Sequence, residues 1–147
     1  MESSPEVTAR RAALEREAPI VPRSVWKRTR LRGVEVVFLC GPIGAEFDAW
    51  QRRLSALSAA DALLSQQIGL AAVEKVMDEL EKKAKAEVEA EGRKMLPRKS
   101  PGYGDLPLSL SRTILAELDA PRKIGVSITD SDLLAPSKSV TAICEIC

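Results

Sequence analysis

The sequence predicts an α+β domain, in which helices pack on a mixed, largely antiparallel sheet of about four strands. Three observations support this fold class. The apolar run VEVVFLC at 34–40 is typical of a strand covered on both faces. Residues 59–91 repeat apolar positions at helical spacing, and SVTAICEI at 139–146 alternates like a strand with one buried face.

A length of 147 residues corresponds to one domain that can bury a hydrophobic core. We predict a short extension over 1–20 and the main domain over 21–147. The extension contains a helix over 5–18, because Pro5 suits a first helical turn. Pro19 and Pro22 end it.

A strand is predicted from Val21 to Leu31, followed by a turn at Gly33 and the central strand. Its segment WKRTRLR, at 26–32, is rich in basic residues. A solvated strand face is the favoured interpretation, and a surface for an anionic partner is the alternative.

Two helices are predicted after the central strand. GPIG at 41–44 forms the tight turn before the first, whose apolar stripe is Ile43, Phe47, Trp50, Leu54 and Leu57. The second runs over 59–91 and ends at Gly92. Its expected buried side is Leu63, Leu70, Val73, Met77, Leu80, Ala84 and Val88. On its opposite side, Lys85 is expected to pair with Glu81 and with Glu89.

The last third of the chain is expected to add one helix and two strands. The helix begins after Asp105, a good N-cap, with Pro107 in its first turn. A strand then follows, with Ile124, Val126 and Ile128 pointing inward, before the final strand.

Histidine is absent, which excludes Ser-His and Cys-His nucleophilic pairs and His-ligated metals. We therefore expect no catalytic side chain and no metal site. The three cysteines suit a reducing, cytoplasmic location. A net charge of +1 argues against nucleic-acid binding, and the longest apolar run is too short to span a membrane.

The loop RKSPGYGD at 98–105 is the candidate binding site. Arg98 offers a planar fork for a carboxylate, and Tyr103 offers a flat face for a purine or a cation. Gly102 lets the backbone approach a ligand, while Pro101 restricts the loop before binding. S-adenosylmethionine combines these chemical groups. From the residues alone, a plain proline-glycine turn remains the alternative.

Two motifs give the chain a resemblance to a known family. They are R-x-x-P-G-Y-G-D-x-P-L, which begins at Arg98, and I-G-V-S-I-T-D-S, which is followed by P-S-K-S-V-T-A. The order of these two motifs and their separation match one family: the chain resembles the activation (reactivation) domain of vitamin B12-dependent methionine synthase, especially its short, free-standing members. The likeness covers about residues 20–146 and is tight in the last third.

This resemblance implies an adenosylmethionine site and a function. Arg98 would hold the methionine carboxylate, the backbone from Pro101 through Gly102 to Tyr103 would accommodate the adenosine, and Asp130 matches an acidic position of the family. The chain would support reductive methylation of cob(II)alamin carried by a B12-dependent methionine synthase or a related corrinoid methyltransferase subunit, with a flavodoxin-like reductant.

Some family elements have no counterpart in this sequence, including an acid in an N-terminal element and a tyrosine beyond the last strand. This difference favours a second hypothesis, a non-catalytic docking or assembly subunit of a corrinoid methyltransferase without useful adenosylmethionine binding. A third is an enzyme that binds another adenosylated or nucleotide ligand through the same loop.

Overall fold

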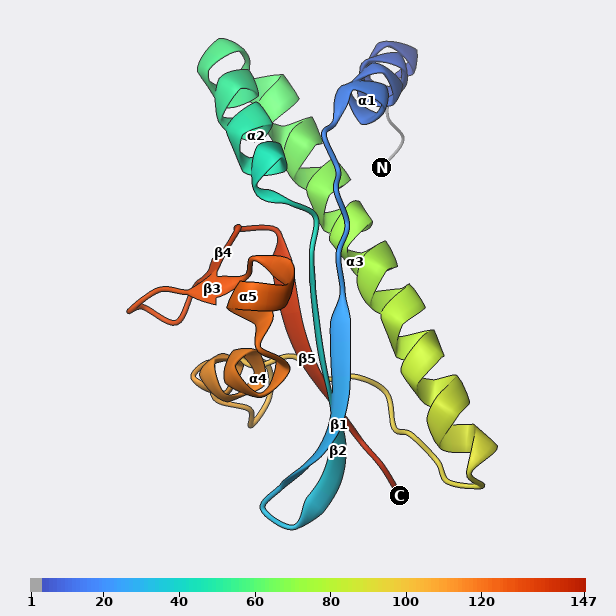
Figure 1. Ribbon diagram of the computed structural model, residues 1–147. Coiled ribbons are helices and arrows are strands. Elements are labelled where there is room, and N and C mark those ends of the chain that lie inside the picture. Colours follow the sequence, from blue (N-terminus) through green and yellow to red (C-terminus); the bar gives the residue numbers. More distant parts are fainter. Residues whose placement is uncertain (1–3) are drawn as a thin grey trace.

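The computed structural model describes residues 4–147 and has five helices and five strands within them (Figure 1). In chain order they are α1 (Pro5–Glu17), β1 (Val25–Leu31), β2 (Val34–Pro42), α2 (Ala45–Leu57), α3 (Ala59–Ala90), α4 (Leu110–Leu118), α5 (Ala120–Ile124), β3 (Ser127–Ile128), β4 (Leu134–Ala135) and β5 (Ser139–Glu145). The α+β class is confirmed.

The main sheet has the order β1-β2-β5, and both of its strand pairs are antiparallel. The run at 34–40 is indeed the central strand. β1 and β2 are joined by a tight turn at Arg32 and Gly33, both of which have positive φ angles, as the twist of a two-residue hairpin requires. The sequence predicts a single mixed sheet of about four strands, whereas the main sheet has three strands and is wholly antiparallel. The remaining strands, β3 and β4, form a separate two-stranded antiparallel sheet.

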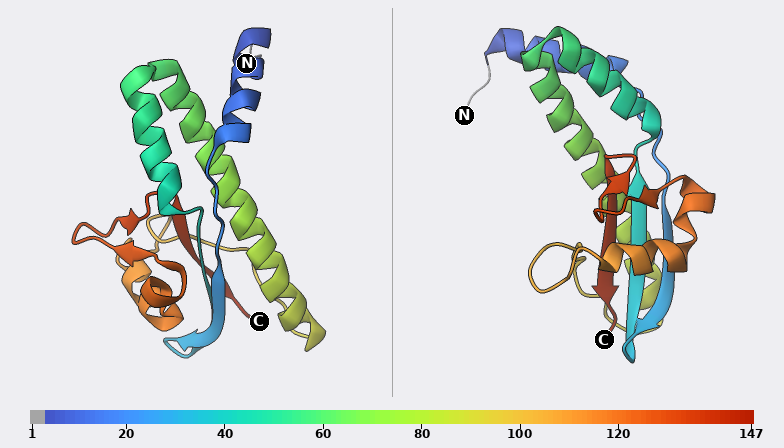
Figure 2. Two further views of the ribbon diagram at one scale, coloured as in Figure 1. Left: turned by 45° about the horizontal axis from the view of Figure 1, so that its top comes forward. Right: turned by 90° about the vertical axis from the view of Figure 1, so that its left-hand side faces the viewer.

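The main sheet is covered by helices on both faces (Figures 1 and 2). Alternate residues of β2 point to opposite faces. On one face, Val36 and Phe38 pack against α4 and α5. On the other, Val37 and Leu39 pack against the C-terminal half of α3. This arrangement explains why the strand is apolar without alternation.

The N-terminal half of α3 extends beyond the sheet and packs with α1 and α2 (Figure 2). This part has its own core, which includes Leu14, Phe47 and Ile68. Gly69 permits the close approach of α2 to α3, because a Cβ atom at Gly69 would lie 2.7 Å from the Phe47 ring. The predicted helix over 5–18 is confirmed, with Ser4 as its N-cap.

The buried side of α3 differs from the prediction in its N-terminal half. Leu63 and Leu70 are 62% and 50% exposed, whereas Leu64 and Ile68 are buried. The helix changes partners along its length, from α1 and α2 to the sheet, so one continuous stripe does not describe it. From Val73 onward, the predicted buried residues are correct.

The segment between the binding loop and β5 also differs from the prediction. The helix α4 begins at Leu110 rather than after Asp105, and Ser109 is its N-cap. Ile124 ends the short helix α5 instead of starting a strand, because Gly125 adopts a left-handed conformation directly after it. Only Ser127 and Ile128 form the strand β3.

Among the helices of residues 4–147, none combines the length and the apolar character needed to cross a membrane.

Candidate functional site

The loop that carries the first motif leaves the main sheet at the outer edge of β5. Residues before the loop and at its start follow this edge: the Leu96 amide donates to the Glu145 carbonyl at 2.9 Å, and Lys99 and Ile143 exchange two backbone hydrogen bonds of 2.9 and 2.8 Å. The chain therefore reaches the loop on a segment fixed to the sheet.

The loop itself is folded back by backbone hydrogen bonds and by glycine conformations. Gly102 has a φ angle of 90°, which L side chains rarely adopt, and its amide donates to the Leu106 carbonyl at 2.9 Å. Pro101 is buried, whereas Tyr103 is 75% exposed. The loop thus presents an aromatic side chain on a constrained backbone.

The loop forms one wall of a groove of about 1460 Å³. Such a space is large enough for a nucleoside that carries an amino-acid tail. Its other walls come from α3, α4, β5 and the loop between β3 and β4. Residues that line it include Glu74, Arg98, Pro101, Tyr103, Ser111, Asp132, Leu133 and Thr141.

On the N-terminal side of Ile143, the outer edge of β5 lines this groove. Ile143 uses both its N–H and its C=O on Lys99. In an antiparallel strand, backbone groups two residues apart face the same edge, so those of Thr141 turn toward the groove. The Thr141 hydroxyl forms a buried hydrogen bond of 2.9 Å with the Ser111 hydroxyl of α4. Thr141 lines the groove and is 3% exposed, so its backbone donor and acceptor lie in a largely buried part of that lining.

Arg98 is not left open to a ligand as the sequence suggests. Its Nη1 donates to Asp78 Oδ1 at 2.8 Å and to Glu81 Oε1 at 2.7 Å, and its Nη2 donates to Glu74 Oε2 at 2.8 Å. The Arg98 side chain is 18% exposed. Its guanidinium is thus already engaged by three carboxylates of α3.

These carboxylates have different surroundings. Glu74 and Asp78 are 59% and 61% exposed, whereas Glu81 is 22% exposed and also accepts the Arg98 backbone amide at 3.4 Å. Partial burial acts to lower the pKa of Arg98, but hydrogen bonds to Asp78 and Glu81 outweigh it and raise the pKa above its ordinary value. Arg98 stays a cation at any physiological pH.

Sequence reasoning missed these three acids as site residues. Their spacing of four and then three residues places Glu74, Asp78 and Glu81 on one side of a helix, and this was the available signal. The prediction instead paired Glu81 with Lys85. In the structure Glu81 binds Arg98, and Lys85 lies 3.8 Å from Glu89, as predicted.

The structure brings three of the five predicted site residues to the groove: Arg98, Pro101 and Tyr103. Gly102 shapes the loop behind them and is outside the groove lining found among residues 4–147. Asp130 is exposed and also lies outside that lining, whereas Asp132 and Leu133 of the same loop take part in it. A role for Asp130 in binding stays a prediction.

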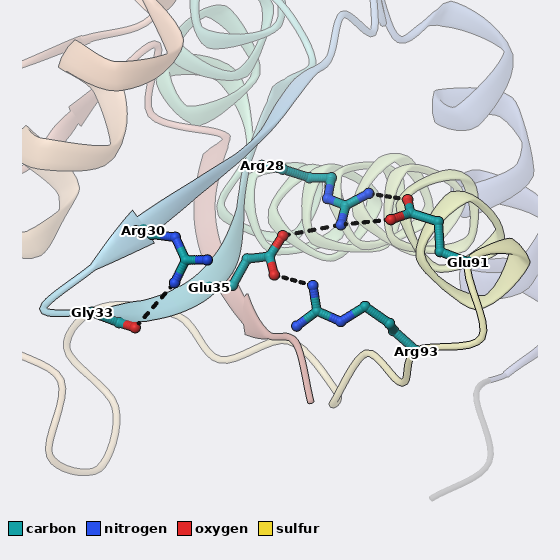
Figure 3. Close-up of polar contacts among 6 residues, drawn as sticks. All are labelled: Arg28, Arg30, Gly33, Glu35, Glu91 and Arg93. Atoms are coloured by element: carbon teal, nitrogen blue, oxygen red, sulfur yellow. Dashed lines mark hydrogen bonds and ion pairs between the residues drawn. The ribbon is translucent and has the colours of Figure 1, made fainter.

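The basic segment at 26–32 is partly neutralised by the protein's own acids. Figure 3 shows Arg28 between Glu35 and Glu91, with an Arg28 Nη2–Glu35 Oε1 distance of 3.0 Å. Glu35 also accepts a hydrogen bond from Arg93. This network favours the interpretation of a solvated strand face over a surface for an anionic partner.

The same network predicts loss of stability in acid. Hydrogen bonds from Arg93 and Arg28 lower the pKa of Glu35 below its ordinary value of 4.5. A carboxylate with a lowered folded-state pKa stabilises the fold above its unfolded pKa, and this contribution disappears as the pH falls through the folded value. We expect the urea midpoint to fall between pH 5 and about pH 3.

Replacement of Glu35 by glutamine tests this prediction. The variant should be less stable than the wild type at pH 7, and its urea midpoint should change less with acidification. Glu87→Gln is the control, because Glu87 is exposed on α3 and has no ion pair among residues 4–147. Parallel pH profiles for all three proteins would contradict the prediction.

None of the three cysteines belongs to the groove lining found among residues 4–147. Cys40 and Cys144 are buried and Cys147 is exposed. Burial raises the pKa of the Cys40 and Cys144 thiols to about 12. Neither buried thiol is therefore a reactive thiolate at neutral pH.

Comparison of the sequence with family models and with curated proteins gives no match. Solved structures do match, among them the crystal structure of the MetH reactivation domain bound to AdoHcy, with a TM-score of 0.64 and 18% sequence identity. The match covers 76% of this chain and 39% of that one, so this chain corresponds to only part of that protein. It has the fold of the MetH reactivation domain.

Proposed function

We propose that this chain binds S-adenosylmethionine in the groove beside the loop at 98–105 and serves as an activation subunit for a corrinoid methyltransferase. The observation that carries the proposal is the groove itself, which the predicted loop forms on a fold shared with a domain that binds AdoHcy. AdoHcy is what remains of adenosylmethionine after its methyl group has been transferred.

The groove has groups that fit each part of this ligand. The backbone N–H and C=O of Thr141 form a donor and acceptor pair suited to the edge of an adenine. Tyr103 offers an aromatic face to the purine or the sulfonium. Arg98 is the basic side chain best suited to bind the carboxylate of the ligand, since a guanidinium can form two parallel hydrogen bonds to a carboxylate.

Charge favours this donor over a nucleotide. Three acids of α3 surround the guanidinium of Arg98. In the groove lining found among residues 4–147, four acids exceed three bases, so the groove is slightly negative; they are Glu74, Asp105, Asp132 and Glu145 against Arg32, Arg98 and Lys99. Adenosylmethionine carries a positive sulfonium and ammonium, whereas ATP carries several negative charges. Like charges in a partly desolvated groove repel, and this disfavours ATP.

The reaction itself requires alignment of the donor and no general base. A corrinoid on the partner, reduced from Co(II) to Co(I) by one electron from a flavodoxin-like reductant, supplies the nucleophile that takes the methyl group. The chain's own residues bind the donor, orient its methyl group and meet the partner. Because none of these roles requires a general base, they are compatible with a sequence without histidine.

A second function is favoured by one observation. Because Arg98 already binds three acids, the chain could keep the fold as a docking or assembly subunit without useful donor binding. Titration calorimetry of the wild type with adenosylmethionine separates the two. Saturable binding of one ligand, with weaker binding of ATP, supports the proposal, and no binding at millimolar ligand favours the docking subunit.

Activation is tested by adding the chain to a Co(II)-corrinoid partner, adenosylmethionine and a low-potential reductant. We expect the absorbance of the methylated corrinoid to appear only when the chain is present. Methylation at the same rate without the chain would contradict an activation role.

A further inference from the structure

We propose that Glu74 is an internal competitor for the carboxylate of the ligand, so that it must release Arg98 before the ligand binds fully. This inference rests on the proposed function, because it concerns regulation of the same groove. This competition would make the affinity of the groove for its ligand lower than it would be if Glu74 did not bind Arg98.

The first argument is the geometry of Arg98. A carboxylate that binds a guanidinium with two parallel hydrogen bonds uses either Nη1 with Nη2 or Nε with Nη2. Both arrangements need Nη2. In the structure Nη2 donates to Glu74 Oε2 at 2.8 Å. Glu74 therefore takes one of the two N–H groups of the nitrogen that every bidentate ligand requires, and its carboxylate repels a ligand carboxylate that approaches the same nitrogen.

The second argument is the difference among the three acids. Asp78 and Glu81 bind Nη1 and can stay in place while a ligand uses Nε and Nη2. Glu81 is also the least exposed of the three and accepts the backbone amide of Arg98, so it anchors the arginine. Asp78 and Glu81 thus orient the guanidinium without blocking it.

The third argument is access. Glu74 lines the groove and is 59% exposed, whereas Asp78 is equally exposed but lies outside the groove lining found among residues 4–147. An exposed ion pair contributes little net free energy, so a ligand can displace Glu74 at a small cost. The contact is therefore strong enough to lower affinity and weak enough to be reversible.

The experiment compares Glu74→Ala with Asp78→Ala. Both substitutions remove one exposed carboxylate that lies 2.8 Å from Arg98 on the same helix, so they change the charge of the site equally. Only Glu74→Ala frees Nη2. By calorimetry, we expect Glu74→Ala to bind adenosylmethionine about three- to five-fold more tightly than Asp78→Ala does.

A second ligand tests whether the competition concerns the carboxylate. Methylthioadenosine has the nucleoside and the sulfur but no carboxylate, so the two variants should bind it with equal affinity. Equal affinities for adenosylmethionine, or weaker binding by Glu74→Ala, would overturn the inference while leaving the proposed function intact. Absence of adenosylmethionine binding in the wild type and both variants would overturn the proposed function, and the inference with it.

Discussion

Replacement of Phe38 by alanine is expected to lower the free energy of unfolding by about 3–5 kcal/mol, the range typical of a buried phenylalanine. Phe38 is 1% exposed and lies on the central strand, in the cluster that joins the sheet to α4. Removal of its ring takes away buried apolar area and leaves a cavity facing Ile114 and Leu118.

Urea unfolding followed by circular dichroism measures this change. Leu57→Ala is the matched control, because Leu57 is 84% exposed at the end of α2 and its truncation should alter stability by less than about 0.5 kcal/mol. A loss of under about 1 kcal/mol for Phe38→Ala would contradict the packing of α4 on this face of the sheet.

Replacement of Arg98 by alanine is expected to weaken adenosylmethionine binding by about ten- to hundred-fold, since a hydrogen bond to a charged group contributes about 1.5–3 kcal/mol. The substitution removes the cation that would hold the carboxylate. It also leaves Glu74, Asp78 and Glu81 without their counter-charge, and these acids would then repel the carboxylate.

Arg93→Ala provides the control for this experiment. Arg93 is also a partly exposed arginine that is paired with a glutamate, Glu35, but it lies outside the groove lining found among residues 4–147. Its loss should affect stability and leave calorimetric affinity unchanged. If both arginine variants bind adenosylmethionine as the wild type does, Arg98 has no part in binding.

Most of the fold could be predicted from local patterns in the sequence. The central strand was recognisable because both of its faces are apolar, and α3 because its apolar spacing continues for many turns. The exposed positions of Leu63 and Leu70 could not be predicted, because they depend on the change of partners along α3. Ile124, Val126 and Ile128 do face the core, as their alternation predicts, but only Ser127 and Ile128 form a strand, and Ile124 belongs to the short helix α5, which was not predicted.

The candidate site was predictable only in part. The loop motif identified Arg98, Pro101 and Tyr103, which lie in sequence close to one another. Glu74, on α3, and Thr141, on β5, are far from this loop in the sequence, and only the fold brings them to the same groove. Local spacing also could not reveal that Arg98 takes its partners from α3.

The central claim is that the loop at 98–105 and the edge of β5 form a binding site for adenosylmethionine. A crystal structure of the protein grown with adenosylmethionine tests it most directly. The account predicts that the adenine lies along Thr141 and Tyr103, that the carboxylate lies on Arg98, and that Glu74 has moved away. An empty groove at saturating ligand, with Glu74 still bound to Arg98, would contradict it.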